Sequence, residues 1–212
     1  MIADFDKLNF KERAIPYEEY FEVMDIDDEQ IEERIKAAND FEGDFLFLLS
    51  LISLQLNIKN VDADYTKSVF ADRWAGTTSK YLDDSDFVTE YSKWFADGAV
   101  DATLRGIDDP WMLSDDRAML NAENEANTVL GRQDFIRALL KGYTQKQWKG
   151  LDDGRERKTH IVLNDKIIPI KKYYQVGNAR MLFPKDISSH MSTGAMYPRE
   201  VIGCRCSIRY LR

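Results

Sequence analysis

Apolar residues recur at helical spacing through the first two thirds of the chain, and the pattern changes after Gly142. Between residues 87 and 102, large apolar side chains repeat about every 3.6 positions behind the capping residues Asp84 and Ser85. After Gly142 the apolar residues stand in short β-branched runs separated by turn residues. The pattern predicts an N-terminal arm over residues 1–16, a helical body over 17–142 and a β-containing C-terminal module over 143–212.

Within the body, the expected helix boundaries follow from capping residues and glycines. Asp27 offers an N-cap to a helix that Gly43 is expected to end, and residues 45–58 form an uncharged run that predicts a second, buried helix. Ser114 caps a long helix, and Gly131 marks a point where that helix can divide. The run of 14 residues is shorter than the roughly 20 apolar residues that cross a bilayer, so we expect no membrane span.

The C-terminal module contains two short runs of β-branched residues. Residues 160–163 and 167–170 flank residues 164–166, which predicts a hairpin whose second strand lies at a sheet edge because it contains Pro169. Residues 206–211 alternate between apolar and polar and predict a closing strand. The expected fold class is α+β, with a mainly helical N-terminal body and a small loop-rich β module at the C-terminus.

Charge is distributed unevenly along the chain. The 212 residues carry a net charge of −8, but residues 141–212 hold 15 Lys and Arg against 6 Asp and Glu, a net of +9. Residues 1–140 hold 14 against 31, a net of −17. Such an asymmetry predicts either different partners for the two ends or attraction between them, within one molecule or between copies.

Both cysteines and both histidines lie in the basic module, which raises the question of a metal site. His160, Cys204 and Cys206, together with His190, are suitable zinc ligands, and a small loop-rich module gains from a metal staple. Against this, Cys-x-Cys is tighter than the usual zinc pair and too tight for an unstrained disulfide. The sequence therefore favours free thiols in a reducing compartment, with no metal and no cofactor.

A catalytic interpretation of the same stretch needs an acid–base and anion-binding cluster. The candidates are Asp152, Asp153, Arg155, Arg157, His160 and Glu200. No serine elbow, phosphate-binding glycine loop or histidine–carboxylate metal pair accompanies them. We therefore expect no enzyme, and an enzyme or toxin-like module that uses Arg155, Arg157, His160 and Cys204 stays as the alternative.

The module also offers basic residues to duplex DNA. Such residues can meet phosphates without reading base sequence, and the binding weakens with salt. The candidate contacts are Lys158, Lys171, Lys172, Arg180, Lys185, Arg209 and Arg212.

The simplest interpretation makes the charged residues structural. A loop-rich module has many backbone carbonyls without ladder partners, and the five donors of an arginine satisfy them well. We prefer this interpretation, in which the structural cluster comprises Trp148, Asp153, Arg155, Arg157, His160, Glu200, Cys204, Arg205 and Cys206. It predicts an enclosed, cross-linked interior, whereas the enzymatic alternative predicts an exposed cleft around His160 and Cys204.

The order and spacing of these residues carry a family resemblance. The matching features are Ala-x-x-Glu at 122–125, Trp148, Asp153-x-Arg155-x-Arg157-x-x-His160, the hairpin, Pro184-x-Asp186, and Glu200-x-x-x-Cys204-Arg205-Cys206. From about residue 120 to 212 the chain resembles the phage Mu F-like family of minor head proteins, also called head morphogenesis proteins. Many relatives have Cys-x-x-Cys where this chain has residues 157–160, which counts against a family metal site here.

The resemblance implies a structural protein of a tailed-phage or prophage particle, present in few copies near the portal vertex. Such a protein acts in capsid assembly and in DNA packaging or delivery, with portal and capsid proteins as partners and duplex DNA as a further one. It would be found in the virion and, during assembly, in the host cytoplasm. Some relatives continue into a toxin or ADP-ribosyltransferase domain, which we do not expect here because the chain ends six residues after Cys206.

Overall fold

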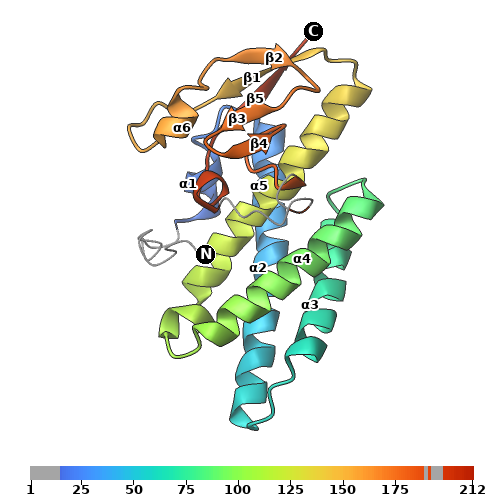
Figure 1. Cartoon of the computed structure of the whole chain (residues 1–212), viewed down its shortest axis with the longest axis vertical. Coiled ribbons are helices and arrows are strands. Elements are labelled where there is room, and N and C mark those ends of the chain that lie inside the picture. The colour runs from blue at the N-terminus through green and yellow to red at the C-terminus, as the bar shows by residue number, and fades with distance from the viewer. Residues whose placement is uncertain (1–14, 189–190, 192–197) are drawn as a thin grey trace.

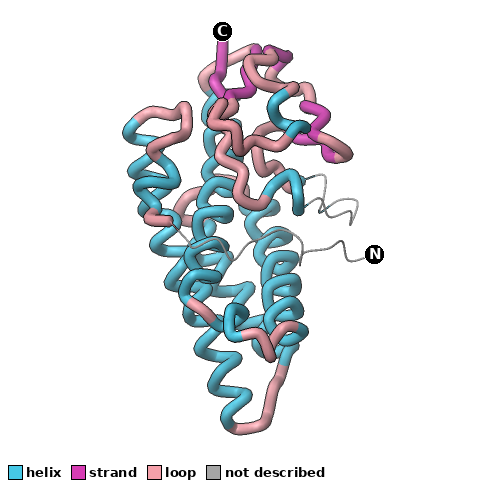
Figure 2. Tube along the Cα trace, turned by 90° about the vertical axis from the view of Figure 1, so that its left-hand side faces the viewer, coloured by secondary structure: helices cyan, strands magenta, loops and turns pink. Residues whose placement is uncertain are grey.

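A bundle of long helices forms one end of the molecule and a group of short strands forms the other (Figures 1 and 2). This computed structural model describes residues 15–188, 191 and 198–212. The chain is 59% helical with small antiparallel sheets at its C-terminal end, which confirms the α+β class. Most of the expected arm over residues 1–16 lies outside the described residues.

The described helices of the body are α1 (Tyr17–Phe21), α2 (Asp28–Asn57), α3 (Ala63–Thr78), α4 (Ser85–Arg105), the 3₁₀ helix η2 (Pro110–Leu113) and α5 (Asp115–Leu140). Three of the long helices of the body, α2, α4 and α5, begin at the capping residues expected from the sequence. The side chains of Asp27, Asp84 and Ser114 each accept a backbone N–H of the first helical turn, as expected of N-caps. None of the described helices is both long and apolar enough to cross a membrane.

Neither glycine expected to interrupt a helix does so. The expected end at Gly43 is wrong, because α2 runs through it as one helix of 30 residues. A helical glycine costs about 1 kcal/mol, which the burial of Phe41 and Phe45 on either side outweighs. Gly131 also lies within an unbroken helix, where a Cβ would stand 3.2 Å from the ring of Phe183. Gly131 therefore lets the C-terminal module pack closely on α5.

Aromatic rings fill the core of the bundle between α2, α3 and α4. Trp74 and Phe95 stack with their ring centroids 4.3 Å apart, and both are buried. Helices α2 and α5 pack along each other, and the buried Arg34 on α2 donates to Asp134 on α5 at 2.7 Å. This pairing sets the direction of α5, whose C-terminal end leads into the module (Figure 1).

The C-terminal module is built from short strands and single helical turns. They are β1 (Gln145–Lys149), α6 (Lys158–Ile161), β2 (Ile167–Pro169), β3 (Tyr174–Val176), β4 (Ala179–Met181), α8 (Pro198–Val201) and β5 (Ser207–Leu211). Strands β2, β1 and β5 form an antiparallel sheet in that order, and β3 pairs with β4. The expected edge strand at Pro169 and the closing strand are therefore both present.

The expected hairpin between residues 160–163 and 167–170 is wrong. The first run begins in the helical turn α6, and β2 pairs with β1 instead. The burial pattern explains the difference: His160 and Leu163 are buried while Ile161 and Val162 are exposed, a spacing of three that suits a helical turn.

The module sits against α1, the start of α2 and α5. Tyr20 on α1 donates a hydrogen bond to the carbonyl of Cys204 at 3.2 Å. Arg209 on β5 pairs with Asp25 at 2.9 Å, and Phe183 packs on Phe135 of α5. Part of the attraction between the basic and acidic ends is therefore satisfied within one molecule.

Candidate functional site

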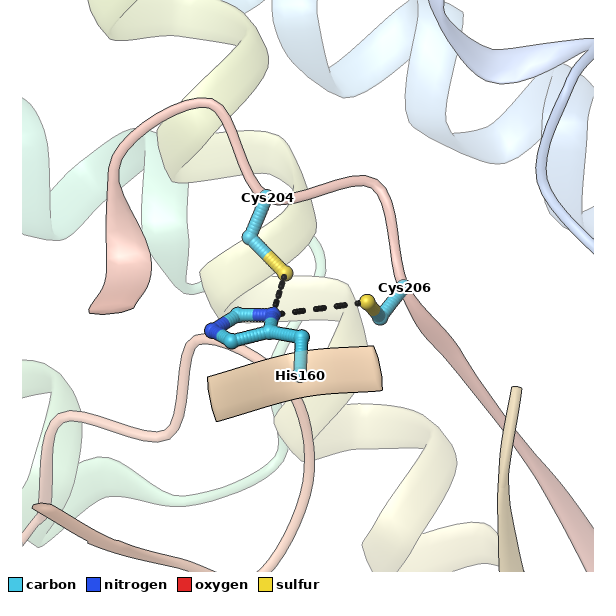
Figure 3. A group of neighbouring side chains, drawn as sticks. All are labelled: His160, Cys204 and Cys206. Atoms are coloured by element: carbon cyan, nitrogen blue, oxygen red, sulfur yellow. Dashed lines mark hydrogen bonds between the residues drawn. The ribbon is translucent and has the colours of Figure 1, made fainter. Parts of the chain in front are cut away.

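Two segments far apart in the sequence bring one histidine and two cysteines together in the module (Figure 3). The turn α6 carries His160, and the extended segment before β5 carries Cys204 and Cys206. The Nδ1 atom of His160 lies 3.5 Å from the Sγ atom of each cysteine. The three residues are 2%, 2% and 6% exposed, and both cysteines are free thiols. We call these three residues the His–Cys cluster.

Local backbone geometry explains why both thiols face the histidine. Side chains alternate along an extended segment, so Cys204 and Cys206 point to one side and the intervening Arg205 points to another. Arg205 reaches Asp153 with a separation of 2.6 Å. Gly203, with a φ of 64°, provides the left-handed turn that enters this segment from α8.

The imidazole ring is held from its far side. Its Nε2 atom lies 3.1 Å from Oε2 of Glu200, and the hydroxyl of Thr159 donates to the same oxygen at 2.7 Å. A carboxylate accepts but does not donate, so Nε2 carries a proton and Nδ1 faces the thiols. Trp148 on β1 packs edge-on against the ring at 5.6 Å between centroids. Glu200 and Trp148 thus set the orientation of the histidine.

The two thiols differ strongly in acidity because they share one hydrogen bond. The hydrogen bond from Cys206 and the one from His160 hold the pKa of the Cys204 thiol well below its usual range. Donating that bond raises the pKa of the Cys206 thiol. Burial acts to lower the pKa of His160, but its hydrogen bond to Cys204 raises that pKa overall. Cys204 is therefore the more acidic of the two thiols.

Three arginines flank the cluster, and their roles differ. Arg157 donates a hydrogen bond to the carbonyl of Ile202 and so ties the start of α6 to the segment before Cys204. Arg205 and Arg155 both bind Asp153. The side chain of Arg155 is 72% exposed, however, and the structure does not bring it into the cross-linked interior.

A small pocket adjoins the cluster. All three cluster residues line it, together with Glu156 and Arg157 among others, and its volume is about 40 Å³. A water molecule needs at least about 10–15 Å³ measured in this way, whereas ligand pockets usually span about 300–1,000 Å³. The pocket therefore has room for an ion with a water molecule and is small beside the pockets that usually hold organic ligands.

Lys185, expected among the DNA contacts, is buried, and that assignment is wrong. It is 1% exposed, and its ammonium donates to Oδ1 of Asn124 at 2.7 Å and to the hydroxyl of Tyr20 at 3.1 Å. Burial lowers its pKa to about 8 and raises that of the neighbouring Glu123 to about 7. The reason lies in the turn after β4, which points the lysine into the interface between module and body.

Sequence reasoning missed this buried polar layer between Lys185 and α5. One signal was present, because residues 122–125 place Glu123, Asn124 and Glu125 side by side in the middle of a long helix. Asn124 accepts from Lys185 and also from the backbone N–H of Gly203 at 2.8 Å. The layer therefore joins α5 to the turn that precedes the His–Cys cluster.

The remaining basic candidates lie on the surface of the module. The exposed residues are Lys158, Lys171, Lys172, Arg180, Arg209 and Arg212. Arg209 is engaged by Asp25, and the guanidinium groups of Arg180 and Arg212 lie over tyrosine rings. His190, the fourth zinc ligand considered, lies outside the described residues.

Comparisons of the chain with protein-family models, with curated proteins and with solved structures returned no match.

Proposed function

We propose that the chain is a structural minor head protein of a tailed phage or prophage, acting in capsid assembly and DNA packaging or delivery near the portal vertex. One observation carries this proposal: several of the residues that carry the family resemblance meet in one buried interior, although Arg155 stays on the surface. Trp148 and Glu200 contact His160, and His160 contacts both cysteines. These residues were singled out by their order in the sequence alone. Their contacts in the fold are those expected of residues that build one shared core.

The enclosure of the cluster favours a structural role over the enzymatic alternative. A catalytic thiol must reach its substrate, yet Cys204 is 2% exposed and its pocket of about 40 Å³ is small beside the usual ligand pocket. A buried network of hydrogen bonds and ion pairs also perturbs the pKa values of its members without any catalytic role. The low pKa of the Cys204 thiol therefore does not by itself indicate an enzyme.

Partners of two kinds fit the two ends of the chain. At the end of the bundle remote from the module, the last turn of α2, the connection after it and the first turn of α3 carry apolar side chains that are 41–62% exposed, namely Leu54, Ile58, Val61 and Tyr65. Exposed apolar groups gathered in this way suit a protein contact, and we assign it to a portal or capsid protein. The exposed basic residues of the module suit duplex DNA or an acidic protein surface.

Deletion of the gene from the phage or prophage that encodes the chain tests the proposed function. We expect loss of infectious particles, restoration by the wild-type gene, and detection of the chain by mass spectrometry in purified wild-type particles. The exposed control variant Glu90→Ala should complement as well as the wild type, whereas a Trp148→Ala variant should not. Infectious, DNA-filled particles that lack the chain would refute the proposal.

A further inference from the structure

The His–Cys cluster presents three soft ligand atoms toward one point. Among the described residues, Nδ1 of His160 and the Sγ atoms of Cys204 and Cys206 all lie within 4.8 Å of one another. Two features of the sequence count against a metal: the tight Cys-x-Cys spacing and the lack of a Cys-x-x-Cys pair at residues 157–160. In the structure a histidine from that second segment, on α6 and more than forty residues before Cys204, supplies a third ligand beside the two cysteines.

The distances match those that a tetrahedral zinc site requires. With zinc–nitrogen bonds of about 2.0–2.1 Å and zinc–sulfur bonds of about 2.3 Å, tetrahedral angles place nitrogen and sulfur about 3.6 Å apart. The structure has 3.5 Å between Nδ1 and each Sγ atom. Both nitrogen–sulfur separations therefore suit a zinc ion bound between Nδ1 and the two Sγ atoms.

The surroundings of the cluster are also those of a metal-binding histidine. A histidine that binds a metal through one ring nitrogen usually donates its other N–H to a carboxylate, which fixes the ring and strengthens the ligand. Glu200 accepts from Nε2 of His160 at 3.1 Å and is itself held by Thr159. The buried side chains of Trp148 and Tyr174 pack around the cluster and keep bulk water away from it.

We propose that the His–Cys cluster binds one zinc ion through Nδ1 of His160 and the Sγ atoms of Cys204 and Cys206. A water molecule from the adjoining pocket takes the fourth position, and Glu200 orients the histidine from outside the coordination sphere. Thiolate and imidazole ligands suit zinc, whereas magnesium and calcium prefer oxygen ligands. This proposal replaces the expectation of no metal and stands independently of the proposed function.

Binding needs no oxidant or other reactant. Zinc forms two bonds to sulfur and one to nitrogen, and the protons still held by the two thiols and by Nδ1 pass to solvent. The ion then links α6 to the segment that leads into β5, across the interior of the module. It serves as a staple for a module that has only a small apolar core.

Elemental analysis of the full-length chain after zinc supplementation and washing with a weak chelator tests the site. We expect about one zinc per chain, and at least about tenfold lower occupancy in each of His160→Gln, Cys204→Ser and Cys206→Ser. Arg155→Ala is the matched control, because Arg155 lines the same pocket but offers no ligand atom, and it should keep full occupancy. Glu200→Gln should still bind zinc, roughly 10–100-fold more weakly.

Cobalt substitution keeps the test decisive if the ligand variants fail to fold. The wild-type chain loaded with cobalt should show a thiolate-to-cobalt charge-transfer band and the intense visible bands of a tetrahedral site. Zinc below about a tenth of an equivalent in the folded wild-type chain, or cobalt spectra without a thiolate band, would overturn the proposal. Full zinc occupancy in a Cys204→Ser, Cys206→Ser double variant would also overturn it.

Discussion

Replacing Lys185 with methionine tests whether the module is cross-linked to α5 through a buried charge. Methionine has an unbranched apolar side chain of similar length. Lysine and methionine adopt the left-handed backbone conformation of residue 185, where φ is 64°, at a similar cost in free energy. The substitution therefore removes the ammonium group and little else. We expect a large loss of stability, because the ammonium holds together Asn124 and Tyr20 and offsets the charge of Glu123.

The size of the expected loss in free energy of unfolding follows from the contacts of the Lys185 ammonium. Hydrogen bonds to a charged group contribute about 1.5–3 kcal/mol each, and two such bonds are lost. Asn124 keeps the N–H of Gly203, and Tyr20 keeps the carbonyl of Cys204, so neither is left without a partner. Removing one member of a buried charged network costs about 3–5 kcal/mol in free energy of unfolding. For a chain of this size, that loss corresponds to about 6–20 °C in melting temperature.

Urea unfolding of the wild type and of Lys185→Met, followed by circular dichroism, measures this free energy. The matched control is Lys172→Met, which makes the same substitution at an exposed position and should change stability by about 0.5 kcal/mol or less. A loss in free energy of unfolding below about 1 kcal/mol for Lys185→Met would refute the buried cross-link and indicate that Lys185 is exposed.

Three further predictions concern the buried layer, the module core and the basic surface. Burial raises the pKa of Glu125 from its ordinary 4.5 to about 8. Between about pH 4.5 and 8 the folded state therefore keeps a proton that the unfolded state has lost. The free energy of unfolding falls as pH rises through that window. Glu125→Gln should therefore raise the urea midpoint at pH 8 and leave it unchanged near pH 5. Equal effects at the two pH values would contradict this. Trp148→Ala should cost about 3–5 kcal/mol and make residues 143–212 sensitive to protease, and resistance equal to that of the wild type would count against it. Titration of the full chain with random-sequence duplex should show binding at 50 mM salt that falls roughly 10³-fold by 200 mM if six phosphates are contacted, and no binding at 50 mM would assign the basic surface to a protein partner.

Local features of the body were predictable because local interactions decide them. The N-caps at Asp27 and Ser114 and the long apolar periods need only neighbouring residues, and they place the helix starts correctly. Gly43 was misjudged because packing against α3 and α5 holds the helix through a residue of poor intrinsic propensity. The turn α6 was misjudged for a similar reason, since β1 takes the strand partner that residues 160–163 were expected to provide.

The members of the site could be named from the sequence, but their arrangement could not. Residue type alone singled out His160, Cys204 and Cys206 as ligand candidates. Their 3.5 Å separations depend on the pairing of β1 with β5 and on Glu200, which no local pattern specifies. Lys185 was assigned to the surface because a lysine usually lies there, and only the tertiary contact with α5 reveals the exception.

An electron-microscopy map of the intact particle is the most direct test of the central claim that the chain is a minor head protein. We expect density for the helical bundle and the attached module in a few copies beside the portal vertex. In that density, the apolar turn between α2 and α3 should contact a portal or capsid subunit. A complete particle map in which no density at the portal or capsid fits α2 packed against α5 would contradict the account.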